Sequence, residues 1–432
     1  MEALLALRDV LAIRPHVDWV APNKEFVYAP MAVAEPFGLA ESRLFDLAAI
    51  AEELGVELRV GTLARVDGED RCLTLGDGRR VAFDAAIIAV GAVRRPWLAG
   101  ALSFGGASDV GAFMGLLERL ESGEVTRLAF TAPPGVMWAL PLYELALLTA
   151  GRLAERGIVG VELTVVTPEA DPLALFGSAA GRMLRDLLSD RGIRLRMGAD
   201  VQALADGRLE LGVGEPIEVD AVVALPELEG PRVEGLPCDA EGFIPVDMHC
   251  RVVGLECVYA AGDGTAFPVK QGGIATQQAD VAVEAIAAGL GESSASPTFN
   301  PMLRGMLLTG VAPMYLRASA SAEFVEGEVA GNALWWPPTK IAGRHLGPYL
   351  TFARSLERGI SLEDRAASMR GLDASKDSHE EARALALTFA EADASSGDFI
   401  SALSWLDVIE RLDGVLTLSC IQLRQEWRAR AG

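Results

Sequence analysis

The stretch Val258–Asp280 reads VYAAGDGTAFPVKQGGIATQQAD, and it decides the fold expected around it. Its apolar start predicts a buried strand, Gly262-Asp263-Gly264 predicts a tight turn, and the small residues after Gln271 predict a helix. This order places one carboxylate and one helix N-terminus at the same end of a strand. A carboxylate accepts hydrogen bonds from sugar hydroxyls, and a helix N-terminus favours negative charge. The stretch therefore predicts a ligand site.

The composition indicates a large folded protein and argues against some functions. At 432 residues, half of them hydrophobic, the chain has the length of about three domains and enough apolar side chains for large cores. The formal charge of −22 argues against nucleic-acid binding. The five cysteines lack CxxC spacing, and the four histidines lack the spacing of a metal centre. We therefore expect a reducing environment and no metal.

The N-terminal residues and the hydropathy pattern bear on the location of the protein. Glu2, Arg8 and Asp9 interrupt the apolar residues at the start, so this segment does not resemble a signal peptide. No stretch approaches the roughly 18 uninterrupted apolar residues of a membrane-spanning helix. We expect a cytoplasmic protein, with peripheral contact at the inner face of the membrane as the alternative.

Two neighbouring tryptophans suggest the alternative of peripheral membrane contact. Trp335 and Trp336, with Lys340 and Arg344 nearby, combine the aromatic and basic residues that favour a membrane interface. A hydrophobic lid packed on the rest of the protein explains the same residues, and the negative net charge disfavours binding to anionic lipid. We therefore prefer the lid.

Hydrophobic periodicity predicts two successive α/β units. The first is expected to contain a helix over Met1–Leu11, strands over Val17–Val20 and Val56–Val60, an antiparallel meander over Arg65–Asp84 and a buried strand within Phe83–Ala92. The second is expected to contain strands over Leu128–Thr131, Val161–Val166 and Asp220–Pro226, with a loop and helix within Ala132–Ala146. From Ser378 onward, two apolar-periodic runs predict a helical hairpin.

Val258–Asp280 closely resembles the second FAD motif of the pyridine nucleotide-disulfide oxidoreductase superfamily. The resemblance implies that Asp263 lies at the ribityl or pyrophosphate part of FAD. It also implies that Lys270 lies by the flavin pyrimidine, where charge appears on reduction. The cofactor-binding residues that it implies are Pro30, Gly91, Gly262, Asp263, Lys270, Gln271 and Gly272.

The same resemblance implies a division of the chain. We expect an α/β fold with two Rossmann-like, doubly wound domains, the second inserted in the first, and a helical tail. The expected domains are an FAD-binding domain over 1–102 and 242–298, an NAD(P)-binding-like domain over 103–241, an interface or lid segment over 299–370 and a helical hairpin over 371–432. In related flavoproteins the third segment covers the flavin, forms a homodimer contact or touches the quinone.

Two features of the superfamily's FAD site are missing. A Rossmann unit opens with a strand and a G-x-G-x-x-G turn, but this chain begins at the helix that should follow them. Loss of that central strand leaves unpaired edges, and each buried unpaired group costs about 1–3 kcal/mol. We therefore expect that Met1 is not the true start or that the chain is a fragment; the alternative is a degenerate protein without FAD. Ala21 also stands where an acidic residue usually bonds the ribose.

The second unit departs from its relatives as well. Pro133 and Pro134 stand where a nucleotide-binding loop carries glycines, and proline offers no N–H to a phosphate. NAD(P) binding is thus weakly supported, with Glu169 at a ribose-acid position as the feature in its favour. Pro141–Glu144 resembles a loop of sulfide:quinone oxidoreductases and flavocytochrome c sulfide dehydrogenases, in which a cysteine precedes the glutamate. Trp138 occupies that cysteine's position, and indole cannot form a persulfide.

These observations predict an FAD-dependent oxidoreductase that transfers electrons through a flavin, is sulfide:quinone-oxidoreductase-like and lacks cysteine persulfide chemistry. Its partner would be a small-molecule or quinone electron carrier. The first alternative is a non-catalytic flavoprotein relic or scaffold, which the missing glycines favour. The second is an NAD(P)H-dependent reductase, which the proline-rich loop disfavours.

Overall fold

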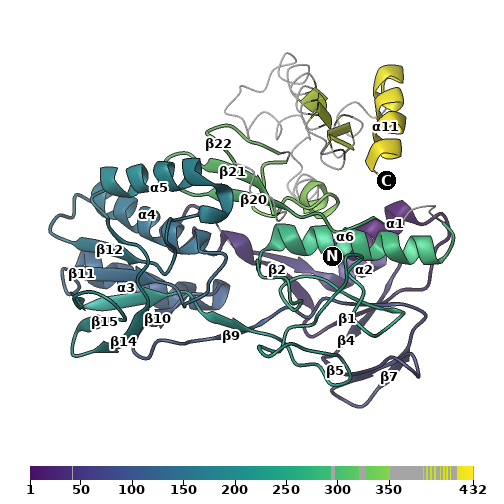
Figure 1. The fold of residues 1–432 in the computed structure, drawn as a ribbon, viewed down its shortest axis with the longest axis horizontal. Helices are drawn as coiled ribbons and strands as arrows, with labels where there is room; N and C mark the ends of the chain where they lie inside the picture. Colours follow the sequence, from purple (N-terminus) through teal and green to yellow (C-terminus); the bar gives the residue numbers. More distant parts are fainter. Residues whose placement is uncertain are drawn as a thin grey trace.

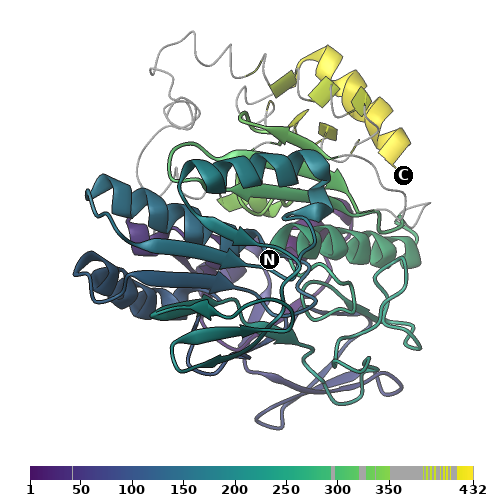
Figure 2. The ribbon, with the colours of Figure 1, turned by 60° about the vertical axis from the view of Figure 1, so that its left-hand side comes forward.

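The protein has a mixed α/β architecture (Figure 1 and Figure 2). The computed structural model describes residues 1–40, 42–292, 297–320, 327–335, 337–350 and, with gaps, 383–431. The expected α/β fold is confirmed, and the chain closes with a helix, α11 (Leu418–Ala431). Most of the expected helical hairpin lies outside the described residues.

The N-terminal unit contains two parallel strand pairs. β1 (Asp18–Ala21) pairs with β4 (Glu57–Val60), and β8 (Ala86–Ile88) pairs with β19 (Val258–Ala260). Within the described ranges no strand is bonded to both pairs, so the sheet is interrupted between them. The pairing of β8 with β19 places the ends of two strands that are distant in sequence at one edge.

Helices flank these strands where the periodicity predicts them. α1 (Glu2–Val10) precedes β1, which confirms the helix expected at the N-terminus, and α2 (Leu47–Leu54) precedes β4. The Asp46 carboxylate caps α2 by accepting a hydrogen bond from the Ala48 N–H (2.8 Å). Gly55 ends α2 with φ of +67°, in the left-handed region that glycine adopts without strain.

The remaining elements of this unit are short. They are the antiparallel pair β2 (Glu25–Tyr28) and β3 (Arg43–Asp46), the 3-10 turns η1 (Ala29–Met31) and η2 (Glu35–Phe37), and the antiparallel meander β5 (Leu63–Asp67), β6 (Cys72–Leu75) and β7 (Arg80–Ala82). The meander confirms the expectation for Arg65–Asp84. β9 (Val93–Arg95) then pairs with β18 (Glu227–Glu229) where the chain passes to the second unit and returns from it.

The second unit is built on a five-stranded parallel sheet. Its strand order is β10 (Leu102–Ser103), β17 (Ala221–Ala224), β11 (Arg127–Thr131), β12 (Glu162–Val166) and β13 (Arg194–Arg196). Its helices are α3 (Val110–Glu121), α4 (Leu140–Glu155) and α5 (Ser178–Asp190), with 3-10 turns η3 (Ala107–Asp109) and η4 (Ala174–Phe176). A small antiparallel sheet contains β14 (Val201–Ala205), β15 (Arg208–Leu211) and β16 (Ile217–Glu218).

The two units meet along α6 (Gly272–Gly289) and a further sheet formed by the C-terminal segment. This antiparallel sheet contains β20 (Met302–Leu307), β21 (Met314–Ser319) and β22 (Glu328–Ala330). β20 contacts both α4 and α6, and α6 runs beside α1 (Figure 1). A helix of the first unit, a helix of the second and the C-terminal segment therefore pack against one another.

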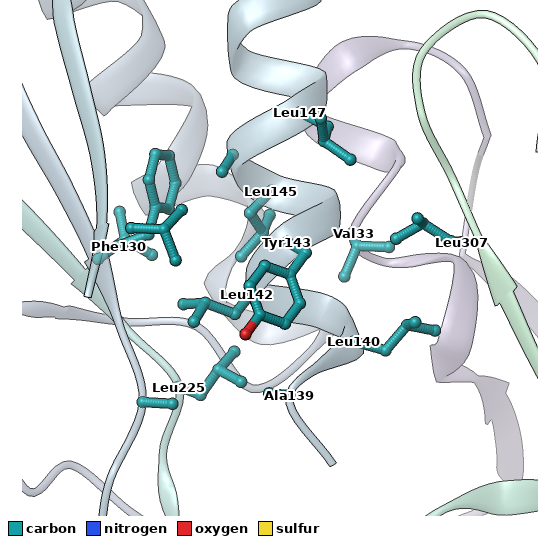
Figure 3. Close-up of a cluster of buried hydrophobic side chains, with 14 of the residues drawn as sticks. Val33, Phe130, Ala139, Leu140, Leu142, Tyr143, Leu145, Leu147, Leu225 and Leu307 are labelled. Atoms are coloured by element: carbon teal, nitrogen blue, oxygen red, sulfur yellow. The ribbon is translucent and has the colours of Figure 1, made fainter. Parts of the chain in front are cut away.

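The largest hydrophobic cluster fills the space around α4 (Figure 3). Leu142 and Tyr143 of α4 are fully buried, Phe130 of β11 packs on one side, and Val33 and Leu307 approach from the other. Since Val33 belongs to the first unit, this core is continuous across both units.

Replacing Phe113 by alanine should lower the free energy of unfolding by about 3–5 kcal/mol, because it deletes a fully buried ring of α3 and leaves a cavity. The ring meets Phe37 and Phe104 edge to face, at 5.7 and 5.4 Å between centroids. Urea denaturation followed by fluorescence measures the loss. Met114→Ala is the control, because this neighbour is 46% exposed. Equal losses in the two variants would contradict the packing described here.

Candidate flavin-contacting site

Residues of the expected ligand site follow β8 and β19 and lie at the carboxyl ends of these two strands. Gly91 follows β8 with φ of +74°, and Gly262 and Asp263 follow β19, where Gly262 has φ of +86°. A Cβ atom on Gly264 would lie 2.9 Å from the Gly91 carbonyl oxygen, so the two loops approach as closely as glycine permits. Carboxyl ends of adjacent parallel strands are the usual position of ligands in open α/β sheets.

Gln278 of α6 fixes the turn that carries Asp263. Its fully buried side chain accepts a hydrogen bond from the Gly262 N–H (2.7 Å) and donates one to the Thr265 hydroxyl (3.1 Å). A buried amide with partners on both of its polar atoms holds one orientation. The turn is thereby held in a defined position against the helix.

Asp263 and Lys270 are opposite charges at this edge. Burial raises the pKa of the Asp263 carboxyl, while Lys270 and Arg94 oppose that shift. Burial lowers the pKa of Lys270 to about 8, against the attraction of Asp263 and Asp239. The Lys270 ammonium donates to the Thr265 carbonyl (2.5 Å) and lies 3.6 Å from the centre of the Phe243 ring. A cation is therefore held next to the turn in a partly desolvated place.

The N-terminus of α6 lies directly after this lysine. Gln271 is the N-cap: it accepts from the Ile274 N–H (3.0 Å) and donates to the Arg304 carbonyl (2.6 Å). A Cβ atom on Gly272 would lie 2.7 Å from the side chain of Ile341. The Ile341 N–H donates to the Tyr28 hydroxyl (3.1 Å). Tyr28 immediately precedes η1, the turn that contains Pro30.

The structure thus brings most of the expected site residues together. Gly91, Gly262 and Asp263 meet at the strand ends, and Lys270 faces Asp263. Gln271 and Gly272 begin the adjacent helix, and the Tyr28–Ile341 contact connects them to the turn that holds Pro30. The sequence did not indicate Arg94 and Asp239, which come from distant positions and follow no motif.

A buried ion pair that the sequence did not indicate lies between the second unit and the segment 337–350. The Lys340 ammonium contacts both carboxylate oxygens of Glu144 at 2.5 Å, and the Leu308 N–H donates to the same carboxylate (2.8 Å). The side chains are 7% and 0% exposed. Burial raises the pKa of Glu144 and lowers the pKa of Lys340, and each charge opposes the shift of the other. The pair ties α4 to the segment 337–350.

The acidic residue expected at a nucleotide ribose has other partners in this structure. Glu169 accepts hydrogen bonds from the Tyr143 hydroxyl, the Thr167 hydroxyl (3.2 Å) and the Leu173 N–H (3.0 Å). Burial raises its pKa, and these hydrogen bonds oppose the shift. A carboxylate engaged in this way provides little support for an NAD(P) site.

Trp138 and the cysteines are the residues that bear on sulfur chemistry. Trp138 packs edge to face on Phe176, with 5.8 Å between ring centroids. All five cysteines are free thiols. Burial raises the pKa of the Cys250 thiol to about 12. Its reactive thiolate form is therefore rare at neutral pH.

Trp335 and Lys340, two of the residues that suggested a membrane interface, have buried side chains. Trp335 is buried and packs on Tyr315, with 5.2 Å between ring centroids, and its indole N–H donates to the Thr339 carbonyl (3.0 Å). Lys340 is engaged with Glu144, whereas Trp336 lies outside the described residues. Among the helices that the structure describes, none is long and apolar enough to cross a membrane.

Comparison with known proteins supports the interpretation of the motif. Residues 145–289 match the family described as pyridine nucleotide-disulphide oxidoreductase. An NADH dehydrogenase-like protein of Mycobacterium tuberculosis is 30% identical over 224 residues, which cover 48% of this chain and 55% of that protein. The ferredoxin reductase component of a chlorobenzene dioxygenase from a Cupriavidus species is 27% identical over 275 residues, covering 61% and 62%.

A solved structure extends the similarity of fold to most of the chain. The sulfide:quinone oxidoreductase of Aquifex aeolicus superimposes with a TM-score of 0.68 over 88% of this chain and 91% of that one, at 16% identity. At that identity the likeness concerns the fold. The chain spans about half the length of the Mycobacterium relatives that it matches. The match over residues 145–289 includes the whole of Val258–Asp280 and agrees with the resemblance of this stretch to the superfamily.

Replacing Lys340 by methionine should lower the free energy of unfolding near neutral pH by about 3–5 kcal/mol, because it leaves the Glu144 carboxylate buried without its cation. The deficit should shrink in acid. In the variant, burial holds the folded-state pKa of Glu144 above its unfolded value of about 4.3. The folded state then binds the extra proton, so the variant loses stability as the pH rises from that value.

Urea unfolding at a mildly acidic and a mildly basic pH measures this dependence. The double variant Glu144→Gln/Lys340→Met should recover most of the loss, since it removes both charges. Arg95→Met is the matched control: its pair with Glu229 has a similar distance (2.6 Å) but is exposed, so this variant should change stability little at either pH. A Lys340→Met deficit that does not depend on pH would contradict the assignment.

Lys270 should titrate near pH 8, because burial disfavours its charged form. The chain has only four lysines, so reductive ¹³C-methylation should give few, separable NMR signals. One lysine signal should titrate near pH 8 and vanish in Lys270→Arg. If the signal removed by Lys270→Arg titrated near the usual lysine pKa of about 10.4, the proposed environment of Lys270 would be wrong.

Proposed function

We propose that this member of the pyridine nucleotide-disulphide oxidoreductase superfamily is an FAD-dependent oxidoreductase that passes electrons through the flavin. The observation that carries the proposal is the meeting of Gly91, Asp263 and Lys270 beside the N-terminus of α6. Two glycine loops, one carboxylate, one ammonium and one helix terminus lie at the carboxyl ends of β8 and β19. This combination suits a ligand that carries both hydroxyls and developing negative charge.

The residues fit the flavin half of FAD better than the adenosine half. The backbone approach at Gly91 and Gly264 leaves no room for a Cβ atom on Gly264, as expected of a cradle for a ligand. Asp263 offers a partly buried carboxylate to ribityl hydroxyls. At the end of β1, Ala21 is a buried apolar residue and offers no acceptor side chain to an adenosine ribose. Asn23 and Glu25, which follow it, are exposed and are the candidates to substitute.

The protein's own part in the chemistry is positioning and electrostatics. Bound FAD supplies the capacity to accept electrons from one substrate and deliver them to another. Asp263, held by the turn that Gln278 fixes, orients the ribityl hydroxyls. Lys270 and the α6 N-terminus place positive potential where the isoalloxazine gains electrons. Because these groups are already in position, little reorganisation is needed when charge develops.

The electron carrier is proposed by class. A small-molecule or quinone carrier remains the primary proposal, and the match to a ferredoxin reductase component adds a small electron-transfer protein as another possible partner. Trp138 and the high thiol pKa of Cys250 argue against a persulfide route. NAD(P)H as donor is the lesser proposal, because Glu169 is engaged in internal hydrogen bonds.

Replacing Asp263 by alanine should weaken FAD binding at least tenfold, since charge-assisted hydrogen bonds contribute about 1.5–3 kcal/mol each and about 1.4 kcal/mol is tenfold. The measurement is reconstitution of the purified protein with FAD, followed by flavin absorption after desalting. Asp84→Ala is the matched control: it removes an exposed carboxylate near the opposite end of the β8–β19 pair. It should leave FAD binding unchanged.

Flavin content that is equal in wild type and Asp263→Ala would remove Asp263 from the site. A wild-type protein that takes up no flavin at all would favour the scaffold alternative. Bleaching of bound flavin by NAD(P)H under anaerobic conditions would support the reductase alternative.

A further inference from the structure

We propose that Glu2, Asp280 and His345 form a binding site for one divalent transition-metal ion, with Zn²⁺ as the reference ion. The three residues come from α1, α6 and the segment 337–350, and all three are buried. One ligand atom from each lies within 4.8 Å of the other two. Imidazole nitrogen and carboxylate oxygen are the donors that such ions take in proteins.

Two of the ligand atoms lack partners in the described part of the chain. His345 Nε2 and Asp280 Oδ1 are buried and form no hydrogen bond, and they face each other at 3.9 Å. The side chains are only 9% and 11% exposed. A buried polar atom without a partner costs about 1–3 kcal/mol. Two such atoms aimed at one point indicate that something binds between them.

The surroundings orient the ligands as they do in established metal sites. His345 Nδ1 lies 2.9 Å from the Asp9 carboxylate. In the tautomer with the proton on Nδ1, the Nδ1–H group donates a hydrogen bond to the Asp9 carboxylate. The lone pair of Nε2 then points into the cluster. The Glu2 carboxylate is held by the N–H groups of His345 (2.8 Å) and Leu346 (2.7 Å). These contacts fix two of the three ligands before any ion binds.

The backbone at Gly343 passes close to the Glu2 carboxylate. A Cβ atom on Gly343 would lie 2.6 Å from a Glu2 oxygen and 2.9 Å from Thr276, so only glycine admits this approach. In a tetrahedral site with bonds of about 2.1 Å, ligand atoms stand about 3.4 Å apart. Side-chain movements of about 1 Å would therefore close the cluster around an ion.

The local charge is suited to a divalent cation. Arg8 pairs with Asp9 (3.1 Å) and Arg344 pairs with Glu284 (3.1 Å). In the described part of the chain, no lysine or arginine forms a salt bridge with Glu2 or Asp280. Two closely placed carboxylates bind a divalent ion or share a proton, and the experiment below separates the two.

The site is distinct from the proposed flavin contacts. Asp280 follows Gly272 by eight residues of α6, about 12 Å along the helix. An ion there would join α1, α6 and the C-terminal segment, so its role would be structural. Its test therefore does not depend on flavin.

The test uses the untagged full chain, stripped with EDTA and titrated with ZnCl₂ against a chromogenic competitor. We expect one ion per chain with a dissociation constant below about 1 µM. His345→Gln and Asp280→Asn each remove a ligand and should weaken binding at least 100-fold. Asp9→Asn leaves the ligands intact but loosens His345, so it should weaken binding about 10–100-fold, and it serves if a ligand variant fails to fold.

His16→Gln is the matched control. His16, Asp18 and Glu57 form a second cluster of the same composition, but it is exposed, and Asp18 is already bonded to Arg59 (2.6 Å). This variant should bind zinc like the wild type. The proposal is overturned if the wild type binds no zinc with this affinity, which would favour a shared proton between Glu2 and Asp280. It is also overturned if His16→Gln abolishes binding or if Asp9→Asn and the ligand variants leave it unchanged.

Discussion

Parallel pairing of β8 with β19 is the constraint on which the candidate site depends. Tyr259 and Ile87 stand opposite each other in this ladder, so the loops after the two strands emerge at one edge. The close approach of Gly264 to the Gly91 carbonyl then follows from the register. A shift of one residue would turn the side chains of one strand to the opposite face and move the loops apart. The position of Asp263 therefore depends on backbone hydrogen bonds between distant parts of the chain.

Buried polar groups define how the segment 337–350 docks on α1 and α4. The Glu144–Lys340 pair joins α4 to the segment 337–350, and Glu2 joins α1 to the same segment through two backbone N–H groups. A purely apolar contact would tolerate sliding, whereas a buried charge without its partner costs several kcal/mol. We infer that these polar contacts fix one docking position for the segment. Ile341, between the two, then meets both Tyr28 and the start of α6.

The sequence predicted those features that have local signals. The strand, turn and helix of Val258–Asp280 lie as expected, because apolar runs, glycines and small residues specify them over short distances. The Glu144–Lys340 pair spans 196 positions, and no periodicity marks such a contact. The histidine spacing gave no sign of the cluster around His345, because Glu2, Asp280 and His345 lie far apart in the sequence. Glu169 matched a position in a motif, but its hydrogen bonds to Tyr143 and Leu173 could be seen only in the folded protein.

A partly buried cation such as Lys270 costs stability, but it can stabilise a ligand that becomes negatively charged. Burial disfavours the ammonium, and among the described residues Asp263, Asp239, the Thr265 carbonyl and the Phe243 ring offset that cost. A ligand that becomes negative during the reaction would add a partner at the moment when its charge develops. Its attraction to Lys270 would then be stronger after electron transfer than before it, and only such differential interactions lower a barrier or shift a potential. An incompletely compensated cation thus fits the proposed electron-transfer function better than a fully neutralised ion pair would.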